Sequence, residues 1–313
     1  MTVTRPTVGL ALSSGGARGA AHTGVLQVLA ANDIPIDLIV GTSIGAMVGG
    51  LYAAGVPLER IEQEWLNTDL VQVAKNLMPT FSRHGWSSGS RVSQMLQRLV
   101  GEAQIEELPL KFVAVAADIN SGEEVVIQQG PLVEAIRASA SIPGLFVPAA
   151  FQGHLLVDGG LVNPLPVDVV RRLGAQLVIA VDLGYYPQQP GRKPGLQLTK
   201  RAIRFIEGHL GGLLPDRWMA PLRTLSHAER EELSRNAPGV INTLILASVI
   251  LQRRIVKLTQ MLTPPEIVIH PRLAEHPPRY YSARRGIEAG RLAAEQALPQ
   301  IKRLLRSVPE DSL

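Results

Sequence analysis

Residues 38–55 read LIVGTSIGAMVGGLYAAG, and this stretch decides the class of fold. An apolar run from Leu38 to Val40 enters the pattern Gly-x-Ser-x-Gly at residues 41–45, and small and apolar residues follow from Ile44 to Ala54. A strand that runs into a tight glycine turn and leaves it as a helix is the arrangement of a nucleophile elbow. Ser43 would then be exposed at a helix N-terminus. The pattern alone fits a plain turn with a helix-capping serine equally well.

Strands and helices alternate on both sides of this stretch. Short apolar runs predict strands, and residues at helical spacing predict helices. Alternation at this length implies parallel pairing and an α/β layered fold. The predicted strands are Val8 to Leu12, Leu38 to Val40, Lys111 to Ala117, Glu124 to Gln128, Leu155 to Asp158 and Leu177 to Leu183; the predicted helices are Thr23 to Asn32, Ile44 to Ala54, Ser90 to Gly101 with Ser90 as its cap, Leu132 to Ser139 and Val167 to Leu173.

The composition changes near residue 185. Residues 185–195 contain three prolines and two glycines, which predicts a loop or linker. Beyond it the pattern is mostly helical, with a long helix from Ile241 to Met261, a strand-like piece from Glu266 to His270 and a last helix from Gly286 to Arg306. We therefore expect a core domain of residues 7–184 and a mainly helical C-terminal extension, residues 185–313, packed on that core.

Charge and cysteine content narrow the function. The net charge is +4 and the basic residues are spread out, whereas a nucleic-acid binder concentrates them on one element, so we expect no nucleic-acid partner. Solvated helix faces account for the short basic clusters, and the alternative is a weak attraction to an anionic membrane surface. The absence of cysteine excludes disulfides, thiol nucleophiles and Cys-ligated zinc, and it fits a reducing compartment.

The hydropathy pattern predicts neither secretion nor a membrane span. The N-terminal stretch lacks a signal-peptide pattern. Residues 38–56 contain five glycines and fit a strand, a turn and a helix, and residues 240–251 are too few to cross a bilayer. We therefore expect a cytoplasmic protein with, at most, a peripheral contact to the inner face of the membrane.

A second glycine-rich turn, Ser13 to Gly19, lies between the first predicted strand and helix. Several backbone N–H groups of such a turn point at one spot, where they can cradle a phosphate or form an oxyanion hole. No Gly-Lys-Ser/Thr follows, so it is not a P-loop. Asp37 lies about as far on as the acid of a dinucleotide site, but Ser14 stands where the first glycine of that fingerprint belongs.

A third turn, Asp158-Gly-Gly160, follows the predicted strand that ends at Asp158. An acid at that point can meet a group at the end of a neighbouring strand, and the simpler interpretation is a common Asp-Gly turn. None of the seven histidines has a setting as suggestive. We expect His154 to be a surface or loop residue, and we expect His22 to pack within its helix, although it could face the site.

Together, the three turns resemble the patatin-like phospholipase family, whose members carry a glycine-rich oxyanion turn, Gly-x-Ser-x-Gly and Asp-Gly-Gly or Asp-Gly-Ala in this order. The stretches Ala138 to Phe146, Asn163 to Pro166 and Val181 to Leu183 are similar to the family as well. The resemblance covers about Val8 to Leu183, and the helical C-terminal third looks like the extension of bacterial members. Many members have glycine where Ser13 and Ser14 stand.

The resemblance implies a three-layer α/β/α sandwich with a mainly parallel sheet, and a hydrolase of lipid acyl esters. It implies a catalytic dyad of Ser43 and Asp158 without histidine, working through an acyl-enzyme. The implied oxyanion hole consists of backbone N–H groups of Gly15, Gly16 and Ala17, and Arg18 would hold the loop or attract a phosphate head group. The glycines implied to shape these turns are Gly19, Gly41, Gly45, Gly159 and Gly160.

The implied substrate is a phospholipid or lysophospholipid, and neither a metal nor an organic cofactor is expected. Residues 208–214 with Trp218 and Met219 are candidates for an acyl groove or a membrane-contact lip, although packing on the core is the simpler interpretation, and residues 77–88 for a mobile segment. Three alternatives stay open: a soluble carboxylesterase or thioesterase with the same dyad, a catalytically silent lipid-binding module, and a nucleotide-binding enzyme.

Overall fold

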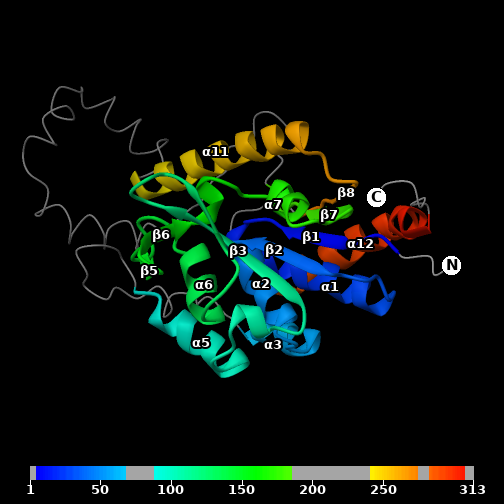
Figure 1. The fold of residues 1–313 in the computed structure, drawn as a ribbon, viewed down its shortest axis with the longest axis horizontal. Coiled ribbons are helices and arrows are strands. Elements are labelled where there is room, and N and C mark those ends of the chain that lie inside the picture. The colour runs from blue at the N-terminus through cyan, green and yellow to red at the C-terminus, as the bar shows by residue number, and fades with distance from the viewer. Residues whose placement is uncertain (1–4, 68–87, 185–239, 274–281, 307–313) are drawn as a thin grey trace, which may run out of the picture. The chain divides into compact units, whose positions relative to one another are not determined.

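The structure is a computed structural model, and it describes residues 5–67, 88–184, 240–273 and 282–306 (Figure 1). The chain divides into one compact unit of residues 1–186, 250–274 and 281–313, and a second of residues 187–249 and 275–280. Only residues 240–249 of the second unit are described. The candidate acyl groove at 208–219 and residues 77–87 of the candidate mobile segment lie outside the described residues.

The first unit is built on one mainly parallel sheet. In the described part of the chain its order is β5-β6-β3-β2-β1-β7-β8, with β4 paired to β3. Strands β3, β2, β1, β7 and β8 run parallel, whereas β4, β5 and β6 pair antiparallel. The strands are β1 (Val8–Leu12), β2 (Leu38–Thr42), β3 (Lys111–Asp118), β4 (Glu124–Ile127), β5 (Ala149–Phe151), β6 (His154–Asp158), β7 (Leu177–Val181) and β8 (Ile267–Ile269).

The antiparallel strands differ from the parallel pairing that the alternation implied. β4 follows β3 after five residues, which is too short for the crossover that a parallel pair needs. β5 was not predicted, and it forms a hairpin with β6 through Gln152 and Gly153. Both turn residues have positive φ, 46° and 85°, as a tight two-residue hairpin requires.

Helices cover both faces of the sheet, so the unit has three layers (Figure 1). In β1, Val8, Leu10 and Leu12 face one cluster of buried side chains and Ala11 faces the other, as the strand period of two dictates. The first cluster includes residues of α1 (Ala20–Ala31), α2 (Ile44–Ala53), α3 (Leu58–Asn67), α5 (Ser90–Val100), α6 (Leu132–Ser139) and α12 (Ala283–Arg306); the second includes residues of α7 (Val167–Arg172) and α11 (Val240–Leu262). The predicted three-layer α/β sandwich is confirmed.

Besides α11, two elements beyond residue 185 are part of these layers. β8 pairs parallel to β7 and extends the sheet. α12 crosses α1 where both helices have glycine: a Cβ added to Gly24 would lie 2.0 Å from the Ile287 carbonyl oxygen, and one added to Gly290 would lie 2.1 Å from that of Ala21. The backbones can approach this closely because no side chain separates them. The domain boundary at residue 185 stays a prediction.

One helix start differs from the sequence prediction. We expected Ser90 to cap α5, but the N-cap is Gly89, with φ of 72°, and Ser90 is the first helical residue. A left-handed conformation of this kind is favourable for glycine, so the chain turns one residue earlier. None of the described helices is long and apolar enough to cross a membrane.

Candidate active site

Ser43 occupies the sharp turn between β2 and α2. Ser43 has φ of 57° and ψ of −117°, a backbone conformation that residues with a side chain rarely adopt. Such a conformation costs of order 1–3 kcal/mol, and strain of this kind clusters at functional sites. The flanking glycines permit the turn: a Cβ on Gly41 would lie 2.5 Å from the Ala46 nitrogen, and one on Gly45 would lie 2.2 Å from the Leu12 carbonyl oxygen. The side chain of Ser43 makes no capping hydrogen bond to α2, so it is not a plain helix cap.

The Ser43 hydroxyl instead donates to Asp158, across 2.5 Å from Oγ to Oδ2. Asp158 is the last residue of β6, which lies antiparallel to β3 with Asp158 opposite Ala116. β2 and β6 are both neighbours of β3, so the sheet brings the two residues together across 115 positions of sequence. Both side chains are buried, with 5% of each residue exposed.

The second oxygen of Asp158, Oδ1, accepts the Gly160 N–H at 2.7 Å. Asp158 therefore makes the ordinary Asp-Gly turn with one oxygen and contacts the serine with the other. Gly159 fits because a Cβ there would lie 2.1 Å from the Val115 carbonyl oxygen. At Gly160, a Cβ would come within 2.9 Å of both Asp158 Oδ1 and Gln252 Nε2.

Burial controls the acidity of Asp158. Removal from water raises the pKa of its carboxyl group from 3.8 to about 6, against the hydrogen bonds from Ser43 and Gly160, which lower the pKa. Desolvation penalises the ionised form, and the two donors recover only part of that loss. The carboxylate therefore predominates at neutral pH, yet it accepts a proton more readily than an exposed aspartate does.

The glycine-rich loop after β1 lies against the start of α2. A Cβ on Gly19 would lie 2.1 Å from Ile44 Cγ1, so only glycine allows this approach. Gly16 has φ of 57°, and residues Gly16–Gly19 form a short 3₁₀ turn. Among the residues that the structure describes, no acceptor is paired with the N–H groups of Gly15, Gly16 or Ala17.

Arg18 and the two serines of this loop hold it in place. The Arg18 backbone N–H and its Nε both donate to the Gly15 carbonyl oxygen, each at 3.3 Å. Ser13 accepts the Leu183 N–H on its Oγ, and Ser14 donates its own N–H to the Pro164 carbonyl oxygen. Both serines are buried and neither has a positive φ, so a side chain is tolerated at each position; the one left-handed residue of the loop is Gly16.

Neither of the two nearby histidines contacts the dyad. His22 is fully buried on α1, its Nε2 is 2.9 Å from the Ser13 carbonyl oxygen, and burial lowers its pKa to about 4. A neutral His22 therefore donates to the loop, as expected of a packed helical residue. His154 is exposed at the start of β6 and its Nδ1 lies 2.7 Å from Asp118 Oδ2.

Four polar contacts around the dyad were not predicted from the sequence. The Ser43 N–H donates to Ser139 Oγ at 2.8 Å, and that hydroxyl donates to the Val115 carbonyl oxygen at 2.6 Å. The Asp158 N–H donates to the Ser141 carbonyl oxygen. The fourth contact comes from α11, where Gln252 Oε1 accepts from Ser14 Oγ at 3.1 Å. Ser139 and Ser141 lie in the stretch from Ala138 to Phe146, which is similar to the family but to which the sequence assigned no function. Nothing in the sequence singled out Gln252.

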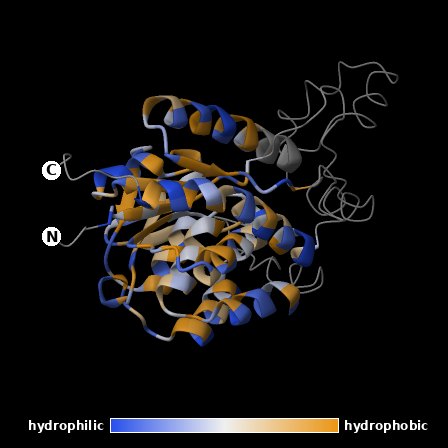
Figure 2. Ribbon diagram, turned by 90° about the vertical axis from the view of Figure 1, so that its right-hand side faces the viewer, coloured by the Kyte–Doolittle hydropathy of each residue, from blue (hydrophilic) through white to orange (hydrophobic). Residues whose placement is uncertain are grey.

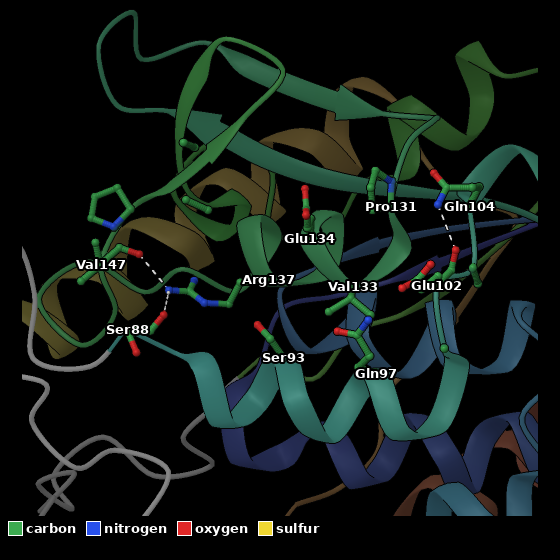
Figure 3. A pocket seen from close by; sticks show the side chains of 15 residues that line it. Ser88, Ser93, Gln97, Glu102, Gln104, Pro131, Val133, Glu134, Arg137 and Val147 are labelled. Carbon is green, nitrogen blue, oxygen red and sulfur yellow. Dashed lines mark hydrogen bonds between the residues drawn. The ribbon is translucent and has the colours of Figure 1, made fainter.

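A separate cavity of about 810 Å³ lies between α5, α6 and the segment before β5 (Figure 3). Its lining includes neither Ser43 nor Asp158. Arg137 closes one end: its guanidinium donates to the carbonyl oxygens of Ser88 and Val147 at 2.8 and 2.9 Å and lies over the Phe146 ring. Since α6 carries both Arg137 and Ser139, the helix that walls this cavity also supports the serine turn. In the described part of the chain, no three His, Asp or Glu side chains gather as a metal site would require.

The fold and the site define a class: an α/β sandwich whose strained strand–serine–helix turn faces an aspartate at the end of a neighbouring antiparallel strand. The sequence matches the patatin-like phospholipase family over residues 10–171, just over half of the chain, and the chain belongs to this family. All three glycine turns lie within the matched range. Membership is consistent with a hydrolase of lipid esters.

The relatives share the same part of the chain. An uncharacterized NTE family protein of Mycobacterium tuberculosis is 41% identical over 191 residues, 60% of this chain and 52% of that protein. The human patatin-like phospholipase domain-containing protein 6 is 37% identical over 187 residues, 58% of this chain and 14% of that protein. This chain thus spans about half the length of the first relative. The solved structure of VipD from Legionella pneumophila aligns with 95% of this chain and 67% of its own, with a TM-score of 0.47 and 13% identity.

Proposed function

We propose that this protein hydrolyses acyl esters of lipids, as a phospholipase A or lysophospholipase, with Ser43 as nucleophile and Asp158 as its base. The observation that carries the proposal is the 2.5 Å hydrogen bond from Ser43 Oγ to Asp158 Oδ2, made by a serine at φ of 57°. A nucleophile within hydrogen-bond reach of a base is the arrangement that covalent catalysis requires. Membership in the patatin-like phospholipase family supports the lipid ester as substrate.

The reaction proceeds in two steps. Ser43 Oγ attacks the ester carbonyl carbon while its proton moves to Asp158 Oδ2, and the tetrahedral intermediate then releases the lipid alcohol, which takes that proton. Water attacks the acyl-enzyme in the same way, with Asp158 again accepting and returning the proton, and the fatty acid leaves. Neither step calls for a metal or an organic cofactor.

The oxyanion of each intermediate would be stabilised by the glycine-rich loop. The N–H groups of Gly15, Gly16 and Ala17 have no acceptor among the described residues, and the loop lies against the helix that begins after Ser43. One well-placed donor of this kind is worth about 10²–10³ in rate. The Ser43 N–H is engaged by Ser139, so the loop is the source of donors that this proposal uses.

The raised pKa of Asp158 suits it to the role of base. A general base works best when its pKa is near the operating pH, because it is then both ionised and able to accept a proton. A pKa of about 6 meets this condition, whereas an ordinary aspartate does not. We further propose that the substrate lies in a membrane and that the protein contacts it peripherally from the cytoplasmic side, which a chain without cysteine suits.

A fluorophosphonate probe tests the dyad directly. Wild-type protein should be labelled on Ser43, as mapped by mass spectrometry, and Ser43→Ala should not be labelled. Asp158→Asn should slow labelling at least a hundredfold, since general-base catalysis contributes about 10²–10⁴. His154→Ala is the matched control and should react like wild type, because His154 bonds Asp118 instead of the dyad.

The same protein separates the competing functions. A labelled enzyme that cleaves short soluble esters better than micellar lysophospholipid would be a carboxylesterase or thioesterase. Folded protein that binds lipid but takes no label would be a silent lipid-binding module. A thermal shift with nucleotides and no label would indicate a nucleotide site in the glycine-rich loop.

A further inference from the structure

The helix α11 carries an unusual combination of residues. Over Val240–Leu262 it contains no Asp or Glu and three cations, Arg253, Arg254 and Lys257. In the part from Ile250 onward, five large apolar side chains are exposed, by 57–83% of their surface. They are Ile250, Leu251, Leu258, Met261 and Leu262.

These side chains lie on one face of the helix. At about 100° per residue, the five apolar residues fall within an arc of roughly 120°. Arg254 lies inside that arc and Lys257 at its border, and both are exposed. Val256 on the opposite side is buried, with 7% exposed, in the core cluster that α7 shares. Figure 2 shows both apolar and hydrophilic residues along α11, the uppermost helix in that view.

The outer helix on the other face of the sheet shows what an ordinary solvated face looks like. On α12 the exposed positions are mostly charged or amide side chains, such as Arg285, Glu288 and Gln296, and Leu292 is the one large apolar residue exposed there among those described. α11 inverts this pattern. Large apolar side chains that gather exposed on one face of a helix mark an interaction site.

We propose that the outer face of α11, from Ile250 to Leu262, docks on an anionic lipid surface. An apolar face with interspersed cations and no acids fits the boundary between acyl chains and negatively charged head groups. A second copy of the same chain is the poorer occupant, because packing two such faces together would bring Arg254 and Lys257 of both copies into one interface, and the helix has no acid to pair with them. The charge on the helix thus selects the membrane as the partner.

This inference rests on the proposed function, because it takes membrane lipid as the partner. It adds the surface of the protein that contacts the membrane. The inner side of α11 carries Gln252, which holds Ser14 of the glycine-rich loop and lies beside Gly160. One helix therefore joins the candidate docking face to the candidate active site. Docking on a lipid surface would hold the loop and the dyad at a fixed position relative to that surface.

Co-sedimentation with vesicles tests the docking face without relying on hydrolysis. Full-length Ser43→Ala protein is mixed with vesicles of phosphatidylcholine containing a quarter of phosphatidylglycerol, or of phosphatidylcholine alone. We expect binding to the anionic vesicles, weaker binding to the neutral ones, and a loss of binding as salt screens the charges. The variant Arg254→Gln/Lys257→Gln should lower the partition coefficient about 25-fold, since each cation near such a surface contributes about fivefold.

The apolar contribution has its own pair of variants. Leu258→Gln/Met261→Gln should bind at least tenfold more weakly, whereas Leu292→Gln on α12, a matched exposed leucine, should bind like the parent. Absence of binding, or equal binding by all variants, would overturn the proposal. So would an oligomer in the absence of lipid that the Leu258→Gln/Met261→Gln change dissociates, because a second copy would then occupy the face.

The two proposals can fail separately. Fluorophosphonate labelling of Ser43 in solution should proceed at the same rate in the Leu258→Gln/Met261→Gln protein as in wild type. Labelling of Ser43 without vesicle binding would refute the docking face and support the proposed hydrolase. Vesicle binding without labelling would refute the hydrolase and support the docking face.

Discussion

Replacing Asp158 by Asn should lower activity at least about a hundredfold and stabilise the fold at neutral pH. Burial raises the carboxyl pKa from 3.8 to about 6, so the folded protein holds this proton more tightly than the unfolded chain does. The resulting stability is fully present below pH 3.8 and is lost as the pH rises through 6. The two values lie about two pH units apart, and each unit is worth about 1.4 kcal/mol, so ionised Asp158 costs the folded state about 3 kcal/mol.

Asparagine keeps the local geometry and removes the titration. Its Oδ1 can accept from Gly160 as Asp158 Oδ1 does, and its Nδ2 would face Ser43 Oγ, which can accept a hydrogen bond. The free energy of unfolding of the variant relative to wild type should therefore rise by about 2–3 kcal/mol between pH 4 and pH 8, mostly below pH 6. Every other group titrates in both proteins and cancels in the difference.

Urea denaturation of both proteins at pH 4, 5, 6, 7 and 8, followed by fluorescence and by circular dichroism, measures this difference. Agreement of the two probes at each pH checks that unfolding has no populated intermediate. A difference that does not change with pH, or that falls as the pH rises, would show that the pKa of Asp158 is not raised by burial. The role of Asp158 as a base would then lose its physical support.

Three further predictions follow from the same contacts. The rate of fluorophosphonate labelling should rise with pH through about 6 and level off by pH 8, because Asp158 must be ionised to accept the serine proton; an inflection that His154→Ala removes would contradict this. Ser139→Ala leaves the buried Ser43 N–H without its acceptor. This loss should lower the free energy of unfolding by about 1–3 kcal/mol and slow labelling at least tenfold. Unchanged labelling would mean that Ser139 does not position the turn. Gly45→Ala should lower the free energy of unfolding by about 3 kcal/mol, because its Cβ would lie 2.2 Å from the Leu12 carbonyl oxygen. Gly50→Ala in the same helix is the control: its Cβ meets the movable end of a side chain, Ile136 Cδ1, and the substitution should cost clearly less. Equal effects of the two substitutions in thermal melts would refute the steric argument.

Local pattern was enough to predict most of the layers. The apolar runs of β1, β2, β3 and β7 are buried on both faces, and buried parallel strands are visible in sequence as such runs. β5 escaped prediction because three residues, Ala149–Phe151, carry too little pattern. The direction of β4 and β6 also escaped, since it depends on the connection and on the neighbour that each strand finds.

The candidate dyad could be named from the sequence only because two turns are recognisable by themselves. Gly-x-Ser-x-Gly after a strand and Asp-Gly-Gly after another each fix a local geometry, and a family resemblance links them. No sequence motif indicated the contacts that support the dyad. Ser139 and Gln252 reach Ser43 and Ser14 across 96 and 238 positions, and no local rule connects residues so far apart.

The sequence by itself determined the α/β class and the two glycine-flanked turns that carry Ser43 and Asp158, because strand and turn patterns follow from interactions between near neighbours in the chain. The family resemblance then linked the two turns as a candidate dyad. The tertiary structure decided what depends on distant segments: the strand order that sets Ser43 and Asp158 2.5 Å apart, and the burial that raises the pKa of Asp158 to about 6. It also decided that α11 turns apolar side chains and cations outward. Burial and exposure are properties of the packed whole, so periodicity can mark a face of a helix but cannot say which face the core will cover.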